Sequence, residues 1–221
     1  MTPPEALLLP LDAPERPIGC IKLSPSAAVL AGFARGREAA IHAGMLAIAA
    51  EAPFRRMITP GGHQMRVAIT NAGAAGWVTD STGYRYDPID PDSGNPWPEL
   101  PASFKALAGD AARVLGFEDF DPDACLINRY EPGARLSLHQ DRNETDFTQP
   151  VVTVSLGLPA IFQWGGATRA DRTCPVRLEH GDVMVWGGAD RLNFHGVKEL
   201  PAGDHPLIGP WRYSLTFRKA R

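Results

Sequence analysis

The sequence lacks several features that would place it in common protein classes. No apolar run approaches the ~20 residues needed to span a bilayer. The first ten residues contain an apolar triplet but no basic residue, which is not the pattern of a secretory signal peptide. The three cysteines, Cys20, Cys125 and Cys174, are odd in number and widely spaced, so they do not form a disulfide framework. We therefore expect a cytoplasmic protein with free thiols and no membrane partner.

A net basic charge is also missing. The 221 residues include 22 Lys and Arg against 25 Asp and Glu, so bulk electrostatic attraction gives no argument for nucleic-acid binding. The charge is uneven, however, because nine acidic and only two basic residues fall between Asp87 and Asp123. The rest of the chain therefore carries a net positive charge and could form a local basic surface. No internal repeat or linker is visible, and one domain is ordinary at this length.

The amino-terminal part of the chain predicts helices. Residues 1–25 hold six of the 21 prolines and indicate an extended entry segment. Residues 26–50 are rich in alanine with apolar residues at helical spacing, which predicts one or two helices that begin near Ser24 or Ser26 and stop before Pro53. A second helix is predicted over residues 102–117, where an apolar stripe is closed by Gly116.

The rest of the chain predicts short strands. Turn signals separate about eight runs after the second helix, at residues 125–130, 135–141, 150–158, 160–165, 174–179, 183–187, 192–197 and 211–218. Short strands at this spacing favour an antiparallel sandwich or barrel, with the helices ahead of it. The predicted class is therefore α+β, mainly β.

Residues 54–86 have a different character. Two short strands with small turns place Trp77, Tyr84 and Tyr86 among arginines and a histidine. Exposed aromatic and basic side chains on a hairpin could stack on a base and hold a phosphate. A hairpin whose aromatic rings simply pack on the sheet remains the other interpretation.

The strongest chemical signal is the pair His139 and Asp141. Alternate residues of a strand point to one face, so the imidazole and the carboxylate are expected to project together. His195 on a later predicted strand offers a third ligand. Two imidazoles and one carboxylate suit Fe(II), with Zn, Mn or Co as substitutes, and a catalytic zinc site is the main chemical rival.

The last predicted strand carries the second signal. Arg212, Ser214 and Arg218 share one face, and two buried arginines without partners would be costly. A small dianion would satisfy both, because Arg binds carboxylates in a two-pronged fashion; a solvated polar face is the alternative. Asn128 and Tyr130 form a further polar pair on one face of an earlier strand.

Together these residues resemble the AlkB family of Fe(II)- and 2-oxoglutarate-dependent dioxygenases. The resemblance runs from about Arg66 to Arg218 and rests on an ordered set of motifs: Asn128-Arg129-Tyr130, His139-Gln140-Asp141, Ser155-Leu156-Gly157, Gly181-Asp182, His195-Gly196 and the run from Arg212 to Arg218. It implies a double-stranded β-helix, or jelly roll, with N-terminal helices and a hairpin nucleotide-recognition lid. The implied organisation is one dioxygenase domain over residues 1–221, with an N-terminal extension and helices (1–53), the lid (54–90) and a helix plus jelly-roll core (91–221).

The resemblance also implies a role for individual residues. Fe(II) would be held by His139, Asp141 and His195. The 2-oxoglutarate contacts fall on Asn128, Tyr130, Arg212, Ser214 and Arg218, where Ser214 departs from the asparagine often found in the family. The base contacts fall on Trp77, Tyr84, Arg85, Tyr86, Asn143 and Arg169. Asn143 stands where the best-known member of the family has an acid, so base preference is the detail that the resemblance determines least.

The implied function is repair of DNA by oxidative demethylation of N-alkylated bases, of the 1-methyladenine and 3-methylcytosine type. The reaction would use Fe(II), O2 and 2-oxoglutarate, and would release formaldehyde, succinate and CO2. We expect a monomer that acts on single- or double-stranded alkylated DNA, with RNA as a further partner. The alternatives are a 2-oxoglutarate dioxygenase that acts on RNA or protein, and a cupin-like metal-binding protein without catalysis.

Overall fold

The computed structural model describes residues 16–221, so the first part of the predicted entry segment lies outside the described residues. The described elements are, in chain order, β1 (Gly19–Ser24), β2 (Ala27–Ala31), α1 (Glu38–Glu51), β3 (Ala68–Gly73), β4 (Gly76–Asp80), β5 (Gly83–Asp87), α2 (Ala102–Val114), β6 (Ala124–Tyr130), β7 (Leu136–His139), β8 (Val151–Gly157), β9 (Ala160–Trp164), β10 (Cys174–Leu178), β11 (Val183–Trp186), the 3-10 helix η2 (Gly188–Asp190), β12 (His195–Val197) and β13 (Arg212–Arg218).

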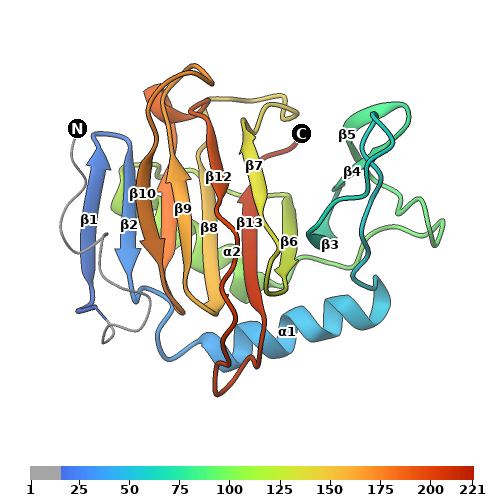
Figure 1. The fold of residues 1–221 in the computed structure, drawn as a ribbon, viewed down its shortest axis with the longest axis horizontal. Coiled ribbons are helices and arrows are strands. Elements are labelled where there is room, and N and C mark those ends of the chain that lie inside the picture. Colours follow the sequence, from blue (N-terminus) through green and yellow to red (C-terminus); the bar gives the residue numbers. More distant parts are fainter. Residues whose placement is uncertain (1–15) are drawn as a thin grey trace.

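The strands form two facing sheets. The major sheet has the order β1-β2-β11-β8-β13-β6-β3, and the minor sheet has the order β10-β9-β12-β7 (Figure 1). Neighbouring strands pair antiparallel throughout, for example β13 with both β6 and β8. The predicted jelly roll is confirmed. It is a sandwich with open edges, and the barrel alternative is wrong.

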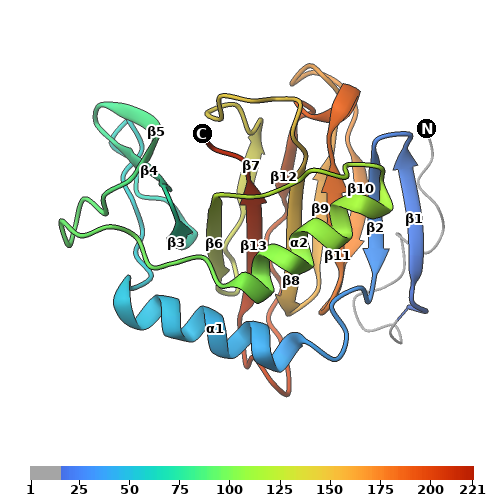
Figure 2. The same cartoon turned by 180° about the vertical axis from the view of Figure 1, so that it is seen from behind.

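The two helices cover the outer face of the major sheet (Figure 2). Phe104 and Leu107 of α2 pack with Met45 of α1 against Ile127 and Phe217 of the sheet. A second apolar cluster fills the space between the two sheets and surrounds the polar side chains of the site. The helices cover one face of the major sheet and the minor sheet covers the other, so the central strands β8 and β13 are buried along their whole length. No helix among residues 16–221 is long and apolar enough to cross a membrane.

The N-terminal prediction was partly wrong. Residues 27–31 form the fully buried strand β2 rather than the start of a helix, and β1 occupies part of the predicted extended segment. A short apolar run that is buried on all sides has the same composition whether it is helix or strand, and here pairing with both β1 and β11 decides. The helix starts only at Glu38, and its end at Glu51, before Pro53, was predicted correctly.

The predicted lid is divided between two sheets. Strand β3 pairs with β6 and forms an edge of the major sheet, whereas β4 and β5 pair only with each other and project beside it (Figure 1). The projecting hairpin is therefore residues 76–87. No disulfide joins the three cysteines.

Candidate metal and cosubstrate site

Three predicted metal ligands converge between the sheets. His139 ends β7, Asp141 follows it, and His195 begins β12, directly opposite His139 in the strand register. Each histidine places Nε2 3.8 Å from an oxygen of Asp141, and one ligand atom from each of the three residues lies within 4.8 Å of the others. This donor set fits Fe(II).

Local sequence explains why β12 can approach β7 so closely. A Cβ atom at Gly196 would lie 2.7 Å from the carbonyl oxygen of Leu136, which is closer than side chains are found. A glycine next to His195 is therefore required for the two histidines to face each other. Each histidine also donates from Nδ1 to the carbonyl two residues earlier, Ser137 at 2.9 Å and Asn193 at 3.0 Å. Because the proton is then on Nδ1, Nε2 is unprotonated and its lone pair can bind a metal.

The electrostatics favour the forms that bind a metal. Burial alone would raise the pKa of Asp141, but Arg218 and the two histidines outweigh it and hold that pKa well below its usual value. Burial, assisted by His139, lowers the pKa of His195 to about 4. At neutral pH the site therefore presents a carboxylate and a neutral imidazole.

Arg218 lies at the centre of a buried charge network. Its Nη2 and Nε donate to Oδ2 of Asp141 at 2.8 and 3.0 Å, and its Nε lies 3.4 Å from Oε1 of Glu144. Glu144 also accepts from Nη2 of Arg191 at 3.1 Å and from the Tyr86 hydroxyl at 2.7 Å. The cation is thus matched by two carboxylates before any anion binds.

Arg212 is in a different position. Its side chain is only 2% exposed, and it donates to the Ser155 hydroxyl at 3.0 Å and weakly to the Leu158 carbonyl at 3.5 Å. Its Nε has no hydrogen-bond partner, and no carboxylate of residues 16–221 lies within ion-pair distance. Burial lowers its pKa. A buried guanidinium without a counterion is the feature that a bound carboxylate would satisfy, so the residues fit a 2-oxoglutarate site.

The other predicted cosubstrate residues lie beside the two arginines. Ser214 pairs with Asn128 across β13 and β6, and the Asn128 amide donates to the Ser214 hydroxyl at 3.4 Å. Tyr130 is opposite Arg212 in the same register, and burial raises the pKa of its phenol. All five predicted cosubstrate residues line one cavity with the metal ligands.

That cavity has a volume of about 1120 Å³ and opens toward the lid. Trp77 and Tyr84 line it and stack on each other, with ring centroids 5.6 Å apart. The Trp77 indole donates to the Asn143 side chain at 3.1 Å. Trp77 and His139 both line the cavity, and the ring that Trp77 contacts is Tyr84.

The remaining base-contact predictions are split. Arg169 is exposed, lines the cavity and lies over the Phe194 ring at 5.3 Å. Tyr86 does not line the cavity, and its hydroxyl donates to Glu144 beside the metal ligands at 2.7 Å. Arg85 alternates to the other face of β5, where it pairs with Asp80 at 2.9 Å and with Asp87 at 3.3 Å. It does not line the cavity, so the structure does not bring Arg85 to the predicted base site.

Sequence reasoning missed several residues of the site. Glu144 and Arg191 are buried charges whose partners are distant in sequence, and only the position of Glu144 three residues after Asp141 could have pointed to it. Phe162 and Trp186 enclose His195, with ring centroids 5.5 and 5.0 Å from its imidazole. Their strand positions predict burial but not this contact.

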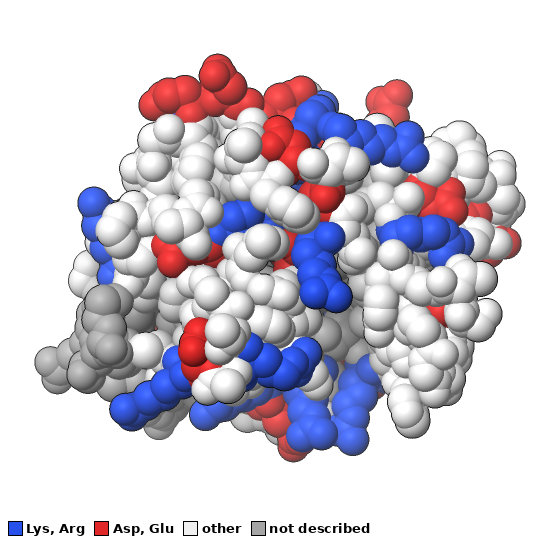
Figure 3. All heavy atoms as spheres, turned by 90° about the horizontal axis from the view of Figure 1, so that it is seen from above, with Lys and Arg blue, Asp and Glu red and all other residues white. Residues whose placement is uncertain are grey.

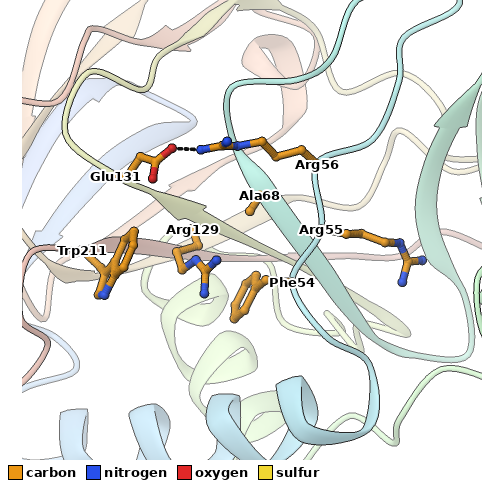
Figure 4. A pocket seen from close by; sticks show the side chains of 7 residues that line it. All are labelled: Phe54, Arg55, Arg56, Ala68, Arg129, Glu131 and Trp211. Carbon is orange, nitrogen blue, oxygen red and sulfur yellow. Dashed lines mark ion pairs between the residues drawn. The ribbon is translucent and has the colours of Figure 1, made fainter.

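A smaller hollow of about 240 Å³ lies on the helix side of the major sheet (Figure 4). Arg129 lies there between Phe54 and Trp211, 4.8 and 4.9 Å from their ring centroids, and Arg56 forms an ion pair with Glu131. Arg129 follows Asn128 on β6 and therefore points to the opposite face. It takes no part in the cavity described above.

Charge is distributed differently over the two sides of the molecule. In the view from above, Lys and Arg side chains gather between the main body and the lid and along the lower margin, whereas Asp and Glu dominate the upper margin (Figure 3). Besides the buried Arg212 and Arg218, four exposed arginines line the cavity, namely Arg66, Arg135, Arg142 and Arg169. The sequence allowed for a local basic surface despite the net negative charge of the chain. In the structure these arginines form such a surface around the cavity.

Comparison with known proteins agrees with this geometry. The family described as the 2OG-Fe(II) oxygenase superfamily matches residues 26–218, which defines the class of protein. The chain is 53% identical over 198 residues to the alpha-ketoglutarate-dependent dioxygenase AlkB of Escherichia coli, covering 90% of this chain and 92% of the relative. It is 43% identical to an AlkB homolog of Caulobacter vibrioides, covering 83% and 82%.

A solved structure, that of OsALKBH1, superimposes with a TM-score of 0.80 at 28% identity, covering 91% of this chain and all of the other. The chain belongs to the AlkB family. It is an Fe(II)- and 2-oxoglutarate-dependent dioxygenase, and O2 is its oxidising cosubstrate.

Proposed function

We propose that this enzyme repairs DNA by oxidative demethylation of N-alkylated bases, of the 1-methyladenine and 3-methylcytosine type. One observation carries the proposal. The buried guanidinium of Arg212, which has no carboxylate partner, and the His-Asp-His group line the same cavity, and stacked aromatic residues of the lid line it as well. A dicarboxylate, a metal and a planar ring therefore each have a matching surface.

The metal is assigned to His139, Asp141 and His195, and the cosubstrate to the β6 and β13 residues. Arg212 would hold one carboxylate of 2-oxoglutarate together with Tyr130. Arg218 would orient the other end together with Asn128 and Ser214, while its bond to Asp141 fixes that ligand. When bound, iron with O2 and 2-oxoglutarate supplies the oxidation of the N-methyl group, with succinate, CO2 and formaldehyde as products.

The lid is assigned to base recognition. Trp77 and Tyr84 offer aromatic faces, and a methylated adenine or cytosine carries positive charge that such faces attract. Asn143 accepts a hydrogen bond from the Trp77 indole. It would offer an amide, in place of a carboxylate, to the edge of the bound base. Closing the hairpin over the ring would keep water from the reacting methyl group.

Nucleic acid is assigned to the mouth of the cavity. Arg66, Arg135, Arg142 and Arg169 could contact backbone phosphates, which position a strand without reading its sequence. A base within a duplex must be extruded to reach a buried metal, and damaged or unpaired bases are extruded at lower cost. Arg85 braces the hairpin through Asp80 and Asp87 in this scheme.

The proposal extends to organisation and location. The range 1–53 forms the N-terminal part, 54–90 the lid region and 91–221 the core of one dioxygenase domain. Three cysteines that form no disulfide agree with a cytoplasmic location. We also propose that the enzyme is a monomer.

The test is a comparison of methylated substrates. The enzyme is incubated with Fe(II), 2-oxoglutarate, O2 and one of four substrates that each carry one N-methyl group: single-stranded DNA, duplex DNA, RNA or a peptide. The products are identified by mass spectrometry. We expect demethylation of DNA at a rate at least equal to that of RNA, with His139→Ala as the inactive control. Demethylation of RNA or peptide alone would replace the DNA assignment.

The non-catalytic alternative is tested in the same reaction. A cupin-like metal-binding protein has no need of Arg212 and Arg218 in one cavity, and it would not convert 2-oxoglutarate to succinate. We expect succinate to form with each of the methylated DNA substrates. Its absence under these conditions would reject the proposed function.

A further inference from the structure

The loop between β11 and β12 is held by the N-terminal hairpin. This loop contains η2 and ends at His195. The hydroxyl groups of Ser24 and Ser26, on the turn between β1 and β2, both donate to Oδ2 of Asp190, Ser26 at 2.6 Å. The same turn accepts a backbone bond from Gly187 to the Ser26 carbonyl at 3.0 Å. Residues more than 160 positions apart thus meet at one carboxylate.

Asp190 is in turn connected to the metal ligand. Its Oδ1 accepts from the Asn193 side-chain amide at 2.9 Å, and its backbone carbonyl accepts from the Asn193 backbone N–H at 2.9 Å. The Asn193 carbonyl then accepts the Nδ1–H of His195 at 3.0 Å. Because Nδ1 carries the proton, Nε2 faces Asp141 with a free lone pair.

The chemistry of Asp190 indicates an orienting group. The carboxylate is partly buried, and its hydrogen-bond partners are two hydroxyls and an amide, with no Lys, Arg or His of residues 16–221 in an ion pair with it. Asn193 is 8% exposed and points toward Asp190, and it does not line the large cavity. Neither side chain can therefore touch a substrate in that cavity.

The same loop also holds the second ligand segment. Arg191 donates from Nη1 to the Asp141 carbonyl at 2.8 Å, and the Gln140 amide donates to the Leu192 carbonyl. Neighbouring residues of one loop therefore form hydrogen bonds to both His195 and Asp141. Asp190 is the point at which this loop is attached to the N-terminal hairpin.

We propose that Asp190 is a positioning residue for His195, and that the turn from Ser24 to Ser26 gives the N-terminal hairpin a role in metal affinity. Groups that orient a metal-bound histidine through its second nitrogen set the direction of its lone pair, and their loss weakens metal binding. The inference rests on the proposed assignment of His195 as an iron ligand.

The test measures metal binding without turnover. Metal-free full-length enzyme is titrated with Co(II), whose visible d–d absorption reports the ligands around it, in the parent, Asp190→Ala and Asp190→Asn. We expect Asp190→Ala to weaken Co(II) binding about tenfold. Asp190→Asn keeps one oxygen acceptor and is expected to recover part of that loss. A purely structural role would lower the thermal midpoint of the metal-free protein without this graded change in affinity.

Two controls make the result decisive. Asp80→Ala removes a carboxylate that also accepts from a hydroxyl in a turn but contacts neither ligand segment, and it should leave the Co(II) affinity within twofold of the parent. His195→Ala should abolish the Co(II) spectrum. Unchanged Co(II) binding in that variant rejects the ligand assignment itself, rather than the positioning role.

If Asp190→Ala does not fold, Ser26→Ala serves in its place. It removes one of the two hydroxyl donors while Ser24 still donates to Asp190, so we expect Co(II) affinity to fall about threefold, less than in Asp190→Ala. An affinity equal to that of the parent in a folded Asp190→Ala, or in Ser26→Ala when Asp190→Ala is unfolded, overturns the proposal.

Discussion

The metal centre and the lid hairpin meet at one cavity but are built in opposite ways. In the centre, Asp141, His195, Arg212 and Arg218 are at most 8% exposed and belong to the jelly-roll strands or lie next to them. On the hairpin, Tyr84 is 49% exposed. Two side-chain hydrogen bonds join the hairpin to the segment after Asp141, one from Trp77 to Asn143 and one from Tyr86 to Glu144.

Because of this difference, the metal centre keeps a fixed geometry whereas the hairpin can move. Breaking one partner from a buried ion pair typically costs about 3–5 kcal/mol, whereas an exposed pair contributes about 0–1 kcal/mol. The centre is therefore held in one arrangement, as a metal and a dicarboxylate require. Two side-chain hydrogen bonds join the hairpin to the segment after Asp141, so breaking only these would let its aromatic residues move away from that segment for an extruded base.

The largest effect is expected from the metal ligands. His139→Ala should lower the rate of succinate formation more than about 10³-fold, because the metal supplies several kcal/mol of transition-state stabilisation. The measurement is succinate yield at saturating 2-oxoglutarate, with metal content determined in parallel. Activity near that of the parent would remove His139 from the metal site.

The two cosubstrate arginines should differ in their effect on folding. Arg218→Met leaves Asp141 without its cation, while Glu144 keeps only Arg191, and it should lower the free energy of unfolding of the metal-free protein by about 3–5 kcal/mol. Arg212→Met removes a buried cation that has no carboxylate partner, so stability should be unchanged or higher.

Both variants should nevertheless raise the dissociation constant for 2-oxoglutarate at least about 30-fold, because each removes a charge pair with the bound anion. Urea unfolding without cofactors and 2-oxoglutarate titration give the two quantities. Equal destabilisation by the two variants would contradict the contrast between a paired and an unpaired arginine.

Acid should destabilise the metal-free centre before it affects the hairpin. The pKa of His195 is about 4 in the folded protein, below the ordinary 6.5. Between these values the unfolded chain binds more protons, so stability falls as pH falls from 6.5 to 4. The contribution of His195 is at most about 3 kcal/mol.

The measurement is urea unfolding in the presence of a chelator across this pH range. His195→Gln should flatten the pH dependence, because it removes the titrating group. The exposed Asp80 of the hairpin has a pKa lowered to about 2 by Thr82 and Arg85, so it does not titrate in this window. An equal slope in the parent and in His195→Gln would show that another group is responsible.

On the hairpin, the stacking residue should have an intermediate effect. Trp77→Ala should raise the KM for a methylated oligonucleotide, because base stacking contributes about 1–3 kcal/mol per base. The KM for 2-oxoglutarate should not change. Trp77→Phe keeps an aromatic face but loses the bond to Asn143, so it separates stacking from that bond.

The smallest effect is expected from Arg85. Its ion pairs with Asp80 and Asp87 are partly exposed and lie on the far face of the hairpin, so Arg85→Ala should change the oligonucleotide KM less than about twofold. Arg169→Ala, at the cavity mouth, should change it more. A large effect of Arg85→Ala would mean that the hairpin turns this face to the substrate.

The sequence predicted the strands of the core and both helical regions because their periodicity was clear and turn residues marked their ends. It failed at residues 27–31, where an alanine-rich apolar run has no periodicity that separates strand from helix. The cosubstrate residues were predicted from a shared strand face, which pairing of β6 with β13 preserves. Arg85 was predicted from a motif, and strand alternation places it on the other face.

What the sequence determined by itself is the chemistry: two histidines, an aspartate and two arginines whose types and order identify the family. Local spacing is enough for this, because alternation along a strand places His139 near Asp141 and puts Arg212 and Arg218 on one face. Only the tertiary structure decided which arginine is paired. Glu144, Arg191 and the Ser24–Asp190–Asn193 chain come from segments distant in sequence, and burial makes such contacts strong without leaving a local pattern.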